Sequence, residues 1–503
     1  MDMYTYARHV PWASAGRLRP LTSRIQGLFF HPGVPFVKAF FWLAVMCAPA
    51  VSAQELSIDP HRAAAAQLVQ GALHDSAAYD RLARLVDTFG HRMSGSESLE
   101  RAIDWIVGEM KRDGFDDVHK EPVQVTHWVR GAESAFLLSP RRTPLHMLGL
   151  GRSVGTPPAG IRAPVLVVRS FADLRARAAE ARGKIVLYNV PFDTTVAPFA
   201  GYGGAVQYRA FGADSASAVG AVAALIRSVT PRSLQSPHTG GMAPYDTTGR
   251  LRRIPAAALS VEDAEMLQRL QDRGQRIELR LTMGARTLAP ARSHNVVAEI
   301  RGSERPDEIV VLGGHVDSWD VGQGAMDDGG GCVAAWEALR LIKQLGTRPR
   351  RTIRVVLWTN EELGLAGANA YRDAHRAEID KHVLTIESDN GVFRPTGIQV
   401  GAGPGGIALM QHIASMLGAA GVDSARLGGP EADVSPLYAL GVPAANVQTD
   451  VLRYFWYHHS EADMLDKLDP ADLAKNVAVL AVVANTIANM DGALPRVAPA
   501  ATP

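Results

Sequence analysis

Cysteine is almost absent from this chain of 503 residues, which contains Cys47 and Cys332 alone. Two cysteines exclude a disulfide-rich scaffold and a zinc site built from several thiolates. An excess of one charge is also missing, because 52 Lys and Arg balance 51 Asp and Glu. This balance gives no general basic face, so nucleic acid is not an expected partner. A hydrophobic share of 47% and a charged share of 20% indicate a globular protein.

Long apolar stretches are equally scarce, and the clearest one lies near the N-terminus at residues 36–53. Lys38 precedes an apolar segment at 39–50, and the small residues 51–53 follow it. This order is typical of a secretory signal peptide and is too short for a stable membrane span. We expect a periplasmic or secreted protein in which residues 1–53 are a signal peptide with an N-terminal extension. A buried helix or a membrane anchor is the alternative.

The remaining chain divides by composition into four segments. Residues 54–130 carry apolar residues at helical spacing and then become strand-like. Residues 150–290 are rich in Gly and Pro between short strand-like and helical pieces, which predicts an inserted α/β domain. Residues 291–492 alternate regularly between strand-like and helical patterns, and 493–503 are rich in Pro and Ala, which predicts a disordered tail.

The alternation within residues 291–492 predicts the fold class. The expected strands are continuous apolar runs separated by amphipathic helices. Such runs are typical of a mostly parallel central sheet that helices flank on both faces, so we expect an α/β fold. In sheets of this kind, functional side chains gather just beyond the carboxyl ends of the strands.

Four polar clusters stand where these strands are expected to end, and a fifth lies nearer the C-terminus. They are HVDS, MDDGGG, NEELG, ESDNG and HHSEAD, which contain His315, Asp317, Asp327, Asp328, Glu361, Glu362, Asp389, His458, His459 and Asp463. Taken alone, each cluster is better explained as a hydrogen-bonded turn or a helix cap. Together they place several carboxylates and imidazoles at one edge of a sheet, where they would repel one another or lose solvation without a cation.

The number of charges suggests two divalent cations. Two Zn²⁺ ions bring +4, Asp327, Glu362 and Asp389 bring −3, and a hydroxide neutralises the remainder. His315 and His459 add neutral imidazole ligands, a mixture that suits zinc. With so few ligands, one carboxylate must bridge the two ions.

The five motifs occur in an order that resembles family M28 of zinc exopeptidases, from about Asp80 onward. ESDNG and the double His resemble the carboxypeptidase Q-like branch most. The resemblance implies that residues 291–492 are the catalytic domain, with 54–130 as its N-terminal part. It also implies that the insertion at 150–290 is a protease-associated-type domain.

The resemblance assigns the metal ligands residue by residue. His315 and Asp389 would hold one zinc ion, Glu362 and His459 the other, and Asp327 would bridge the two.

The resemblance also implies roles for the neighbouring residues. Glu361 would be the general base, and Asp317 would orient His315 by accepting from its second ring nitrogen. Asp328 would support the bridging position, where the family often has a cis peptide bond. His458 stands where some relatives have a Tyr that donates to the developing oxyanion, and we expect the same catalytic role of it.

The expected activity is hydrolysis of peptide bonds in short peptides or dipeptides by a metal-activated hydroxide, with two Zn²⁺ per chain. Aminopeptidase, dipeptidase and carboxypeptidase activity all fit this metal core, and we favour short peptides with a free N-terminus. The alternatives are a non-catalytic receptor or scaffold, and a glutaminyl cyclase-like acyltransferase with one metal. The resemblance alone implies a homodimer.

Overall fold

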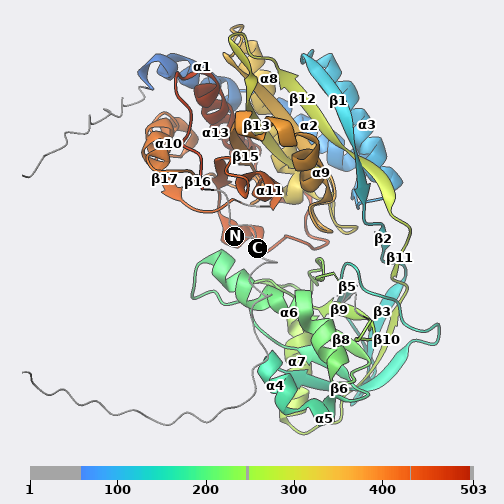
Figure 1. Ribbon diagram of the computed structural model, residues 1–503. Coiled ribbons are helices and arrows are strands. Elements are labelled where there is room, and N and C mark those ends of the chain that lie inside the picture. Colours follow the sequence, from blue (N-terminus) through green and yellow to red (C-terminus); the bar gives the residue numbers. More distant parts are fainter. Residues whose placement is uncertain (1–57, 245–248, 431, 499–503) are drawn as a thin grey trace, which may run out of the picture.

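The computed structural model describes residues 58–244, 249–430 and 432–498. They form two lobes, each built on an eight-stranded sheet (Figure 1). We call the lobe of residues 133–283 the inserted lobe, and the rest the large lobe. The predicted signal peptide lies outside the described residues.

The large lobe is built on the sheet β1-β12-β14-β13-β15-β18-β16-β17. Its strands are β1 (Asp117–Val125), β12 (Ala291–Ile300), β13 (Arg305–His315), β14 (Arg351–Trp358), β15 (His382–Glu387), β16 (Gly397–Gly401), β17 (Ala425–Leu427) and β18 (Ala444–Gln448). The central strands β14, β13, β15 and β18 are parallel. The predicted α/β class is therefore confirmed, and the parallel strands form the centre of a mixed sheet.

The antiparallel strand β12 has a topological cause. β1 runs toward the inserted lobe and β12 returns from it, so these two neighbours are antiparallel. β14 is antiparallel to β12 and again runs toward the inserted lobe. The carboxyl ends of the central parallel strands therefore face the junction between the lobes, where functional groups are expected.

Helices cover both faces of this sheet (Figure 1). They are α1 (Arg62–Leu73), α2 (Ala77–Phe89), α3 (Glu97–Arg112), α8 (Gly330–Gln344), α9 (Ala366–Ala374), α10 (Gly406–Ala414), α11 (Ser435–Tyr438), α12 (Val451–Tyr454) and α13 (Pro470–Asn489). Val310 and Leu312 of β13 belong to the core with α8 and α13, whereas Val311 belongs to a second core with α9 and α11. This alternation is the two-residue period of a strand that is buried on both sides.

Helix α13 is apolar enough to cross a membrane by length and composition, and it is the one such helix in the described residues. Its most apolar window is 83% buried inside the protein, so it is a core helix here. The helix begins where the Asp469 side chain accepts a hydrogen bond from the N–H of Ala471 (2.9 Å), with Pro470 in the first turn.

The inserted lobe contains the sheet β4-β3-β10-β6-β7-β8-β9-β5. Its strands are β3 (Glu133–Ser139), β4 (Thr143–Leu145), β5 (Met147–Gly149), β6 (Ile161–Val168), β7 (Ile185–Tyr188), β8 (Ala223–Arg227), β9 (Ala256–Leu259) and β10 (Glu278–Met283). Its helices are α4 (Phe171–Ala176), α5 (Ala178–Ala181), α6 (Pro198–Ala218) and α7 (Val261–Asp272). The predicted boundary at residue 150 is too late, because β3, β4 and β5 pair within this sheet.

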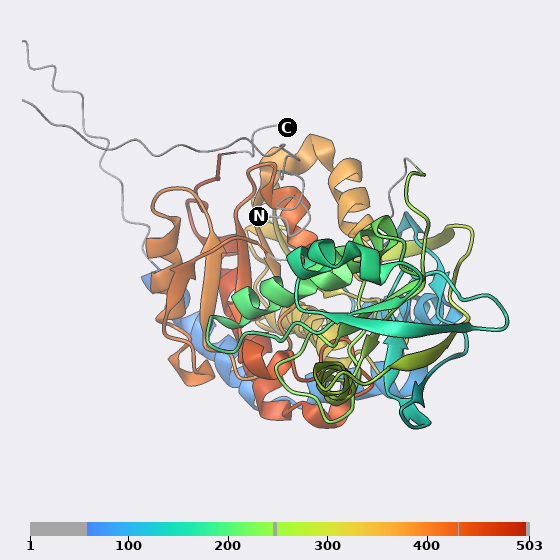
Figure 2. The ribbon, with the colours of Figure 1, turned by 90° about the horizontal axis from the view of Figure 1, so that it is seen from below.

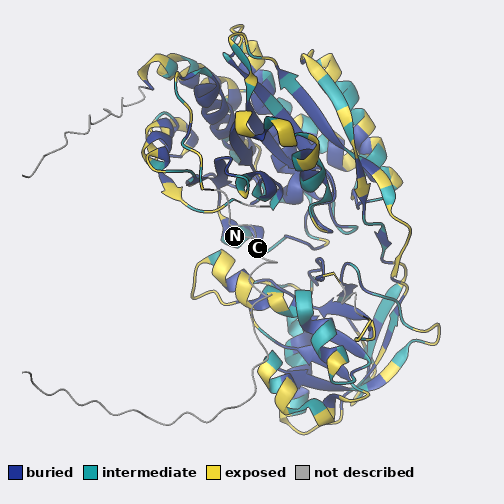
Figure 3. Cartoon of the chain, viewed as in Figure 1, coloured by how far each residue is buried: buried dark blue, intermediate teal, exposed yellow. Residues whose placement is uncertain are grey.

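A short ribbon joins the lobes where the chain crosses between them. It consists of β2 (Trp128–Val129) and β11 (Arg286–Thr287), which pair antiparallel. Figure 2 shows the inserted lobe in front of the large lobe when the molecule is seen from below. Trp128 packs edge-on against Trp319 of the large lobe, with ring centroids 6.4 Å apart. The facing segments are largely buried (Figure 3).

The C-terminal segment differs from the predicted disordered tail over residues 493–498. Leu494 is 3% exposed, and the Arg496 guanidinium donates to the backbone carbonyls of Ile379 (3.2 Å) and His382 (3.1 Å). Leu494 supplies the apolar anchor that the Pro/Ala composition obscures. Residues 499–503 lie outside the described part of the chain.

Candidate active site

The carboxyl ends of three neighbouring strands supply most of the site. His315 is the last residue of β13, Glu361 and Glu362 follow β14, and Asp389 follows β15. All of these strands are parallel, so their ends meet at one edge of the sheet. This placement follows the strand-end pattern predicted from the sequence.

Asp327 is presented by a loop that other carboxylates hold in place. The loop forms the irregular turn Ala325–Gly329, and the Asp327–Asp328 peptide bond is cis, as the resemblance implies. The Asp463 carboxylate accepts hydrogen bonds from the N–H groups of Ala325 (3.1 Å), Met326 (2.7 Å) and Asp327 (3.2 Å). These hydrogen bonds hold the backbone at Asp327 in place and leave its carboxylate available to a metal ion.

Asp328 has the supporting position that the resemblance implies. One of its carboxylate oxygens accepts from the backbone N–H of His315 (3.1 Å) and the other from that of Gly331 (3.1 Å). Although Asp328 lies near His315 and Asp389 in a geometry compatible with a metal, both of its oxygens already serve the backbone. We therefore assign it to holding the loop.

One ligand set gathers around the first oxygen of Asp327. Nε2 of His315 lies 3.1 Å from Oδ1 of Asp327 and 3.4 Å from Oδ1 of Asp389. The three side chains come from three separate segments of the chain, so their convergence is a product of the fold.

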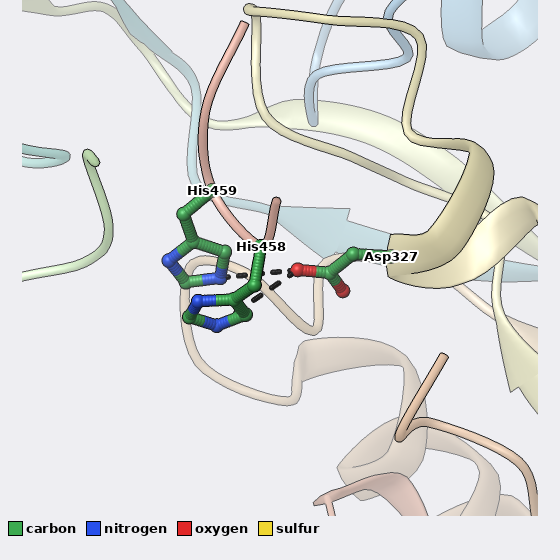
Figure 4. Close-up of side chains that lie close together, drawn as sticks. All are labelled: Asp327, His458 and His459. Atoms are coloured by element: carbon green, nitrogen blue, oxygen red, sulfur yellow. Dashed lines mark ion pairs between the residues drawn. The ribbon is translucent and has the colours of Figure 1, made fainter. Parts of the chain in front are cut away.

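A second ligand set gathers around the other oxygen. Nε2 of His459 lies 3.3 Å from Oδ2 of Asp327 and 3.1 Å from Oε2 of Glu362. Figure 4 shows the rings of His458 and His459 facing the Asp327 carboxylate. The five predicted ligands therefore form two groups that share Asp327.

Unsatisfied oxygens mark the places where cations would bind. Oδ2 of Asp327, Oε1 of Glu362 and Oδ1 of Asp389 are buried and have no hydrogen-bond partner among the described residues. Buried carboxylate oxygens normally have a partner, and a divalent cation between carboxylate and imidazole supplies one. The residues present thus fit a pair of metal ions.

The electrostatics lead to the same conclusion. Burial, together with the charges of Asp327 and Glu361, raises the pKa of Glu362 well above its ordinary value. Burial likewise raises the pKa of Asp389, and that of Glu361 to about 8. Burial lowers the pKa of His459 to about 4, which keeps its imidazole neutral. The neutral imidazole of His459 and carboxylates that need a counter-charge are ligands suited to a divalent metal.

The contacts of Asp317 differ from those predicted. Nδ1 of His315 contacts the backbone oxygen of Asp317 at 3.0 Å, whereas the nearest oxygen of the Asp317 carboxylate is 3.9 Å away. The prediction that the side chain orients His315 is wrong, because the backbone carbonyl of Asp317, and not its carboxylate, lies within hydrogen-bond distance of the ring. The carboxylate instead accepts from the N–H of Glu361 (3.1 Å) and the hydroxyl of Ser94 (3.0 Å).

His458 lies beside the second ligand set. Its ring stacks on that of His459 with centroids 3.5 Å apart, and its Nε2 is 4.0 Å from Oδ2 of Asp327. Its Nδ1 is buried without a hydrogen-bond partner among the described residues. Burial and the neighbouring His459 lower the pKa of His458 well below its usual range, so the ring is neutral.

Several residues around the site are not found by sequence reasoning. The buried Arg92 donates to the backbone oxygens of Val316 (2.8 Å), Gln323 (2.8 Å) and Gly324 (2.9 Å), which shapes the loop before Asp327. Asp463 stands in a motif, but only the structure shows its hydrogen bonds. His238 of the inserted lobe contacts the His458 backbone, and no local pattern marks it.

A narrow gap too small to hold a water molecule borders the second ligand set. Its lining comprises Trp319, Val321, Gly324, Asp327, Glu362, His459, Ser460 and Asp463. These side chains therefore pack closely around the second ligand set.

Known proteins are similar to this chain in sequence and in fold. The model of peptidase family M28 matches residues 295–484. Carboxypeptidase Q of Mus musculus is 47% identical over 423 residues, covering 84% of this chain and 88% of the relative. Carboxypeptidase Q of Homo sapiens is 47% identical over 418 residues, covering 83% and 86%.

Solved structures of peptidases have a similar fold. The peptidase M28 precursor from Shewanella amazonensis SB2B has a TM-score of 0.83 at 37% identity, covering 88% of this chain and 100% of that one. A zinc aminopeptidase from Bacillus subtilis shares the fold, with a TM-score of 0.59 at 21% identity and coverage of 80% and 93%. The chain belongs to peptidase family M28 and is a metallopeptidase, a hydrolase similar to carboxypeptidase Q.

Proposed function

We propose that this metallopeptidase is a dizinc exopeptidase that cleaves short peptides and dipeptides. The observation that carries the proposal is the position of Asp327, whose Oδ1 faces His315 and whose Oδ2 faces His459. A carboxylate that offers one oxygen to each of two ligand sets is the arrangement expected of a bridge between two metals.

Each ion would have three ligands from the protein. His315, Asp389 and Asp327 would hold one, and Glu362, His459 and Asp327 the other. Zinc bound there would polarise the substrate carbonyl and make water acidic enough to attack at neutral pH.

Glu361 would move the proton. It directly precedes Glu362, yet of the two only Glu362 forms an ion pair with His459 in the described part of the chain. The N–H bond to Asp317 fixes the backbone of Glu361. Its carboxylate would take a proton from the attacking water and deliver it to the leaving amine. Burial raises its pKa to about 8, and nearby cations would lower it toward the operating pH.

His458 would stabilise the transition state. A neutral imidazole has one N–H to donate, and burial keeps this ring neutral. Its position against His459 places that donor beside the second ligand set, where negative charge develops on the carbonyl oxygen.

The substrate class is inferred from the relatives. Relatives are named carboxypeptidase Q and, at 26% identity, probable leucine aminopeptidase 2 of Aspergillus fumigatus. We propose short peptides with a free N-terminus.

The domain and export assignments complete the proposal. Residues 54–130 and 291–492 would form the peptidase domain, and the insertion would be a protease-associated-type domain. The segment at 36–53 would direct export before removal.

The decisive experiment combines metal analysis with a peptide panel. Two zinc ions per chain and release of an amino acid from dipeptides, lost when the N-terminus is blocked, are expected. Metal binding without hydrolysis would instead indicate a receptor or scaffold. One metal with pyroglutamate formation would indicate a cyclase.

A further inference from the structure

The inserted lobe contacts the backbone of the paired histidines directly. Nδ1 of His238 lies 2.6 Å from the carbonyl oxygen of His458, and the N–H of Thr239 donates to the carbonyl oxygen of His459 at 2.8 Å. His238 is 1% exposed. Two successive carbonyls of the ligand segment are thus held by two successive residues from the other lobe.

The conformation of His459 explains why such support matters. Its φ is +61°, in the left-handed region that side chains other than glycine rarely adopt. A residue in this region keeps its conformation only when its surroundings impose it. His238 and Thr239 hold the carbonyls of the two histidines, and so fix the direction in which the His459 imidazole leaves the backbone.

The chemistry of the contact identifies His238 as a donor. A carbonyl oxygen can only accept, so Nδ1 of His238 carries the proton. Its Nε2 is buried and has no hydrogen-bond partner among the described residues. The residue therefore makes one directed hydrogen bond at the cost of an unsatisfied nitrogen, which apolar packing alone would not require.

A side chain of the inserted lobe also contacts the ring of His459. Nη1 of Arg209, from α6, lies 3.2 Å from its Nδ1 and 3.5 Å from the carbonyl oxygen of Thr239. Arg209 and Thr239 of the inserted lobe therefore contact the ring and the carbonyl oxygen of His459, respectively.

We propose that His238 is a positioning residue that holds His459 in its ligating orientation, so that the inserted lobe completes the metal site. This proposal rests on the proposed function. The class of ligand it serves is a divalent transition metal bound by His459, Glu362 and Asp327.

The test compares variants of His238 in the full chain. H238L removes the N–H donor and keeps most of the volume, whereas H238N keeps an N–H donor at the position of Nδ1. H146L is the matched control, because His146 belongs to the same lobe and contacts Asp263 (3.2 Å), not the ligand segment. Zinc affinity is measured by competition with a chromophoric chelator, and the absorption spectrum of the Co²⁺-loaded protein reports the ligand geometry.

H238L should lose about 10- to 100-fold in affinity for one of two zinc ions and change the Co²⁺ spectrum. H238N and H146L should match the native protein. H238A, a smaller non-donor variant, decides the question if H238L does not fold. Native affinity and spectra in a folded non-donor variant would overturn the proposal, as would an equal loss in H238N. A native protein that binds no zinc would refute the proposed function instead.

Discussion

The N–H of Glu361 donates to the Asp317 carboxylate at 3.1 Å, which fixes the backbone of the proposed base. The same Asp317 offers its carbonyl oxygen to His315. One residue therefore positions a metal ligand through its backbone and the base through its side chain, and substitution can separate these two effects.

Replacing Asp317 by Ala tests this separation. D317A keeps the carbonyl that orients His315 and removes the acceptor for the Glu361 N–H. We expect kcat to fall by about 100-fold through misplacement of the base, with two zinc ions retained. Parallel metal analysis and steady-state kinetics provide the check. Loss of a zinc ion would show that the carboxylate, and not the carbonyl, supports His315.

The adjacent glutamates should respond differently to the same change. E361Q removes the proton acceptor with little change in shape, so kcat should fall by about 10²- to 10⁴-fold with native zinc content. E362Q should lose zinc, because Glu362 pairs with His459 at 3.1 Å. Measurements of metal content and dipeptide hydrolysis for both variants check this prediction. An active E361Q would remove Glu361 from the mechanism.

Asp463 offers a test of the loop that carries Asp327. D463N keeps the shape but replaces an acceptor oxygen by an NH₂ group facing backbone donors. With three N–H groups dependent on this carboxylate, we expect a loss of about 1–3 kcal/mol in the free energy of unfolding, and weaker zinc binding. Denaturant unfolding of the metal-free protein measures the first effect. D380N, at an exposed surface position, is the control. Equal stability of D463N and the native chain would contradict the account.

His382 predicts a pH dependence of stability far from the metal site. Burial lowers its pKa to about 4, while Nδ1 contacts the Glu378 carbonyl (2.9 Å) and Nε2 contacts the Tyr371 hydroxyl (3.0 Å). The unfolded chain binds a proton near pH 6.5 and the folded chain only near 4, so stability is present above pH 6.5 and is lost as pH falls toward 4.

A lowering of the His382 pKa from 6.5 to about 4 corresponds to about 3–4 kcal/mol of stability. H382Q does not titrate in this range, so its free energy of unfolding should fall less between pH 6.5 and 4. Urea unfolding with a chelator present removes the pH dependence of metal binding. Parallel pH profiles of H382Q and the native chain would contradict the pKa shift.

The sequence predicts the candidate metal ligands better than it predicts the residues that hold them in place. His315, Glu362 and Asp389 can be found because each follows an apolar strand, and parallel strands end together. Whether the carbonyl or the carboxylate of Asp317 contacts His315 cannot be read from the spacing of the motif, since it depends on the local backbone conformation. His238 is 221 positions from His459 and lies in another lobe, so only tertiary structure joins them.

The fold shows the same limit. Alternating apolar strands and helices predict the α/β class, but strand direction depends on where the insertion leaves the sheet, as β12 shows. The boundary near residue 133 escapes composition because β3 looks like any other short strand.

The most direct test of the central claim is anomalous zinc scattering from crystals of the zinc-loaded protein. The account predicts two zinc peaks, one bound by His315 and Asp389 and the other by Glu362 and His459, with one Asp327 oxygen on each. A single peak, or two peaks that Asp327 does not join, would contradict it.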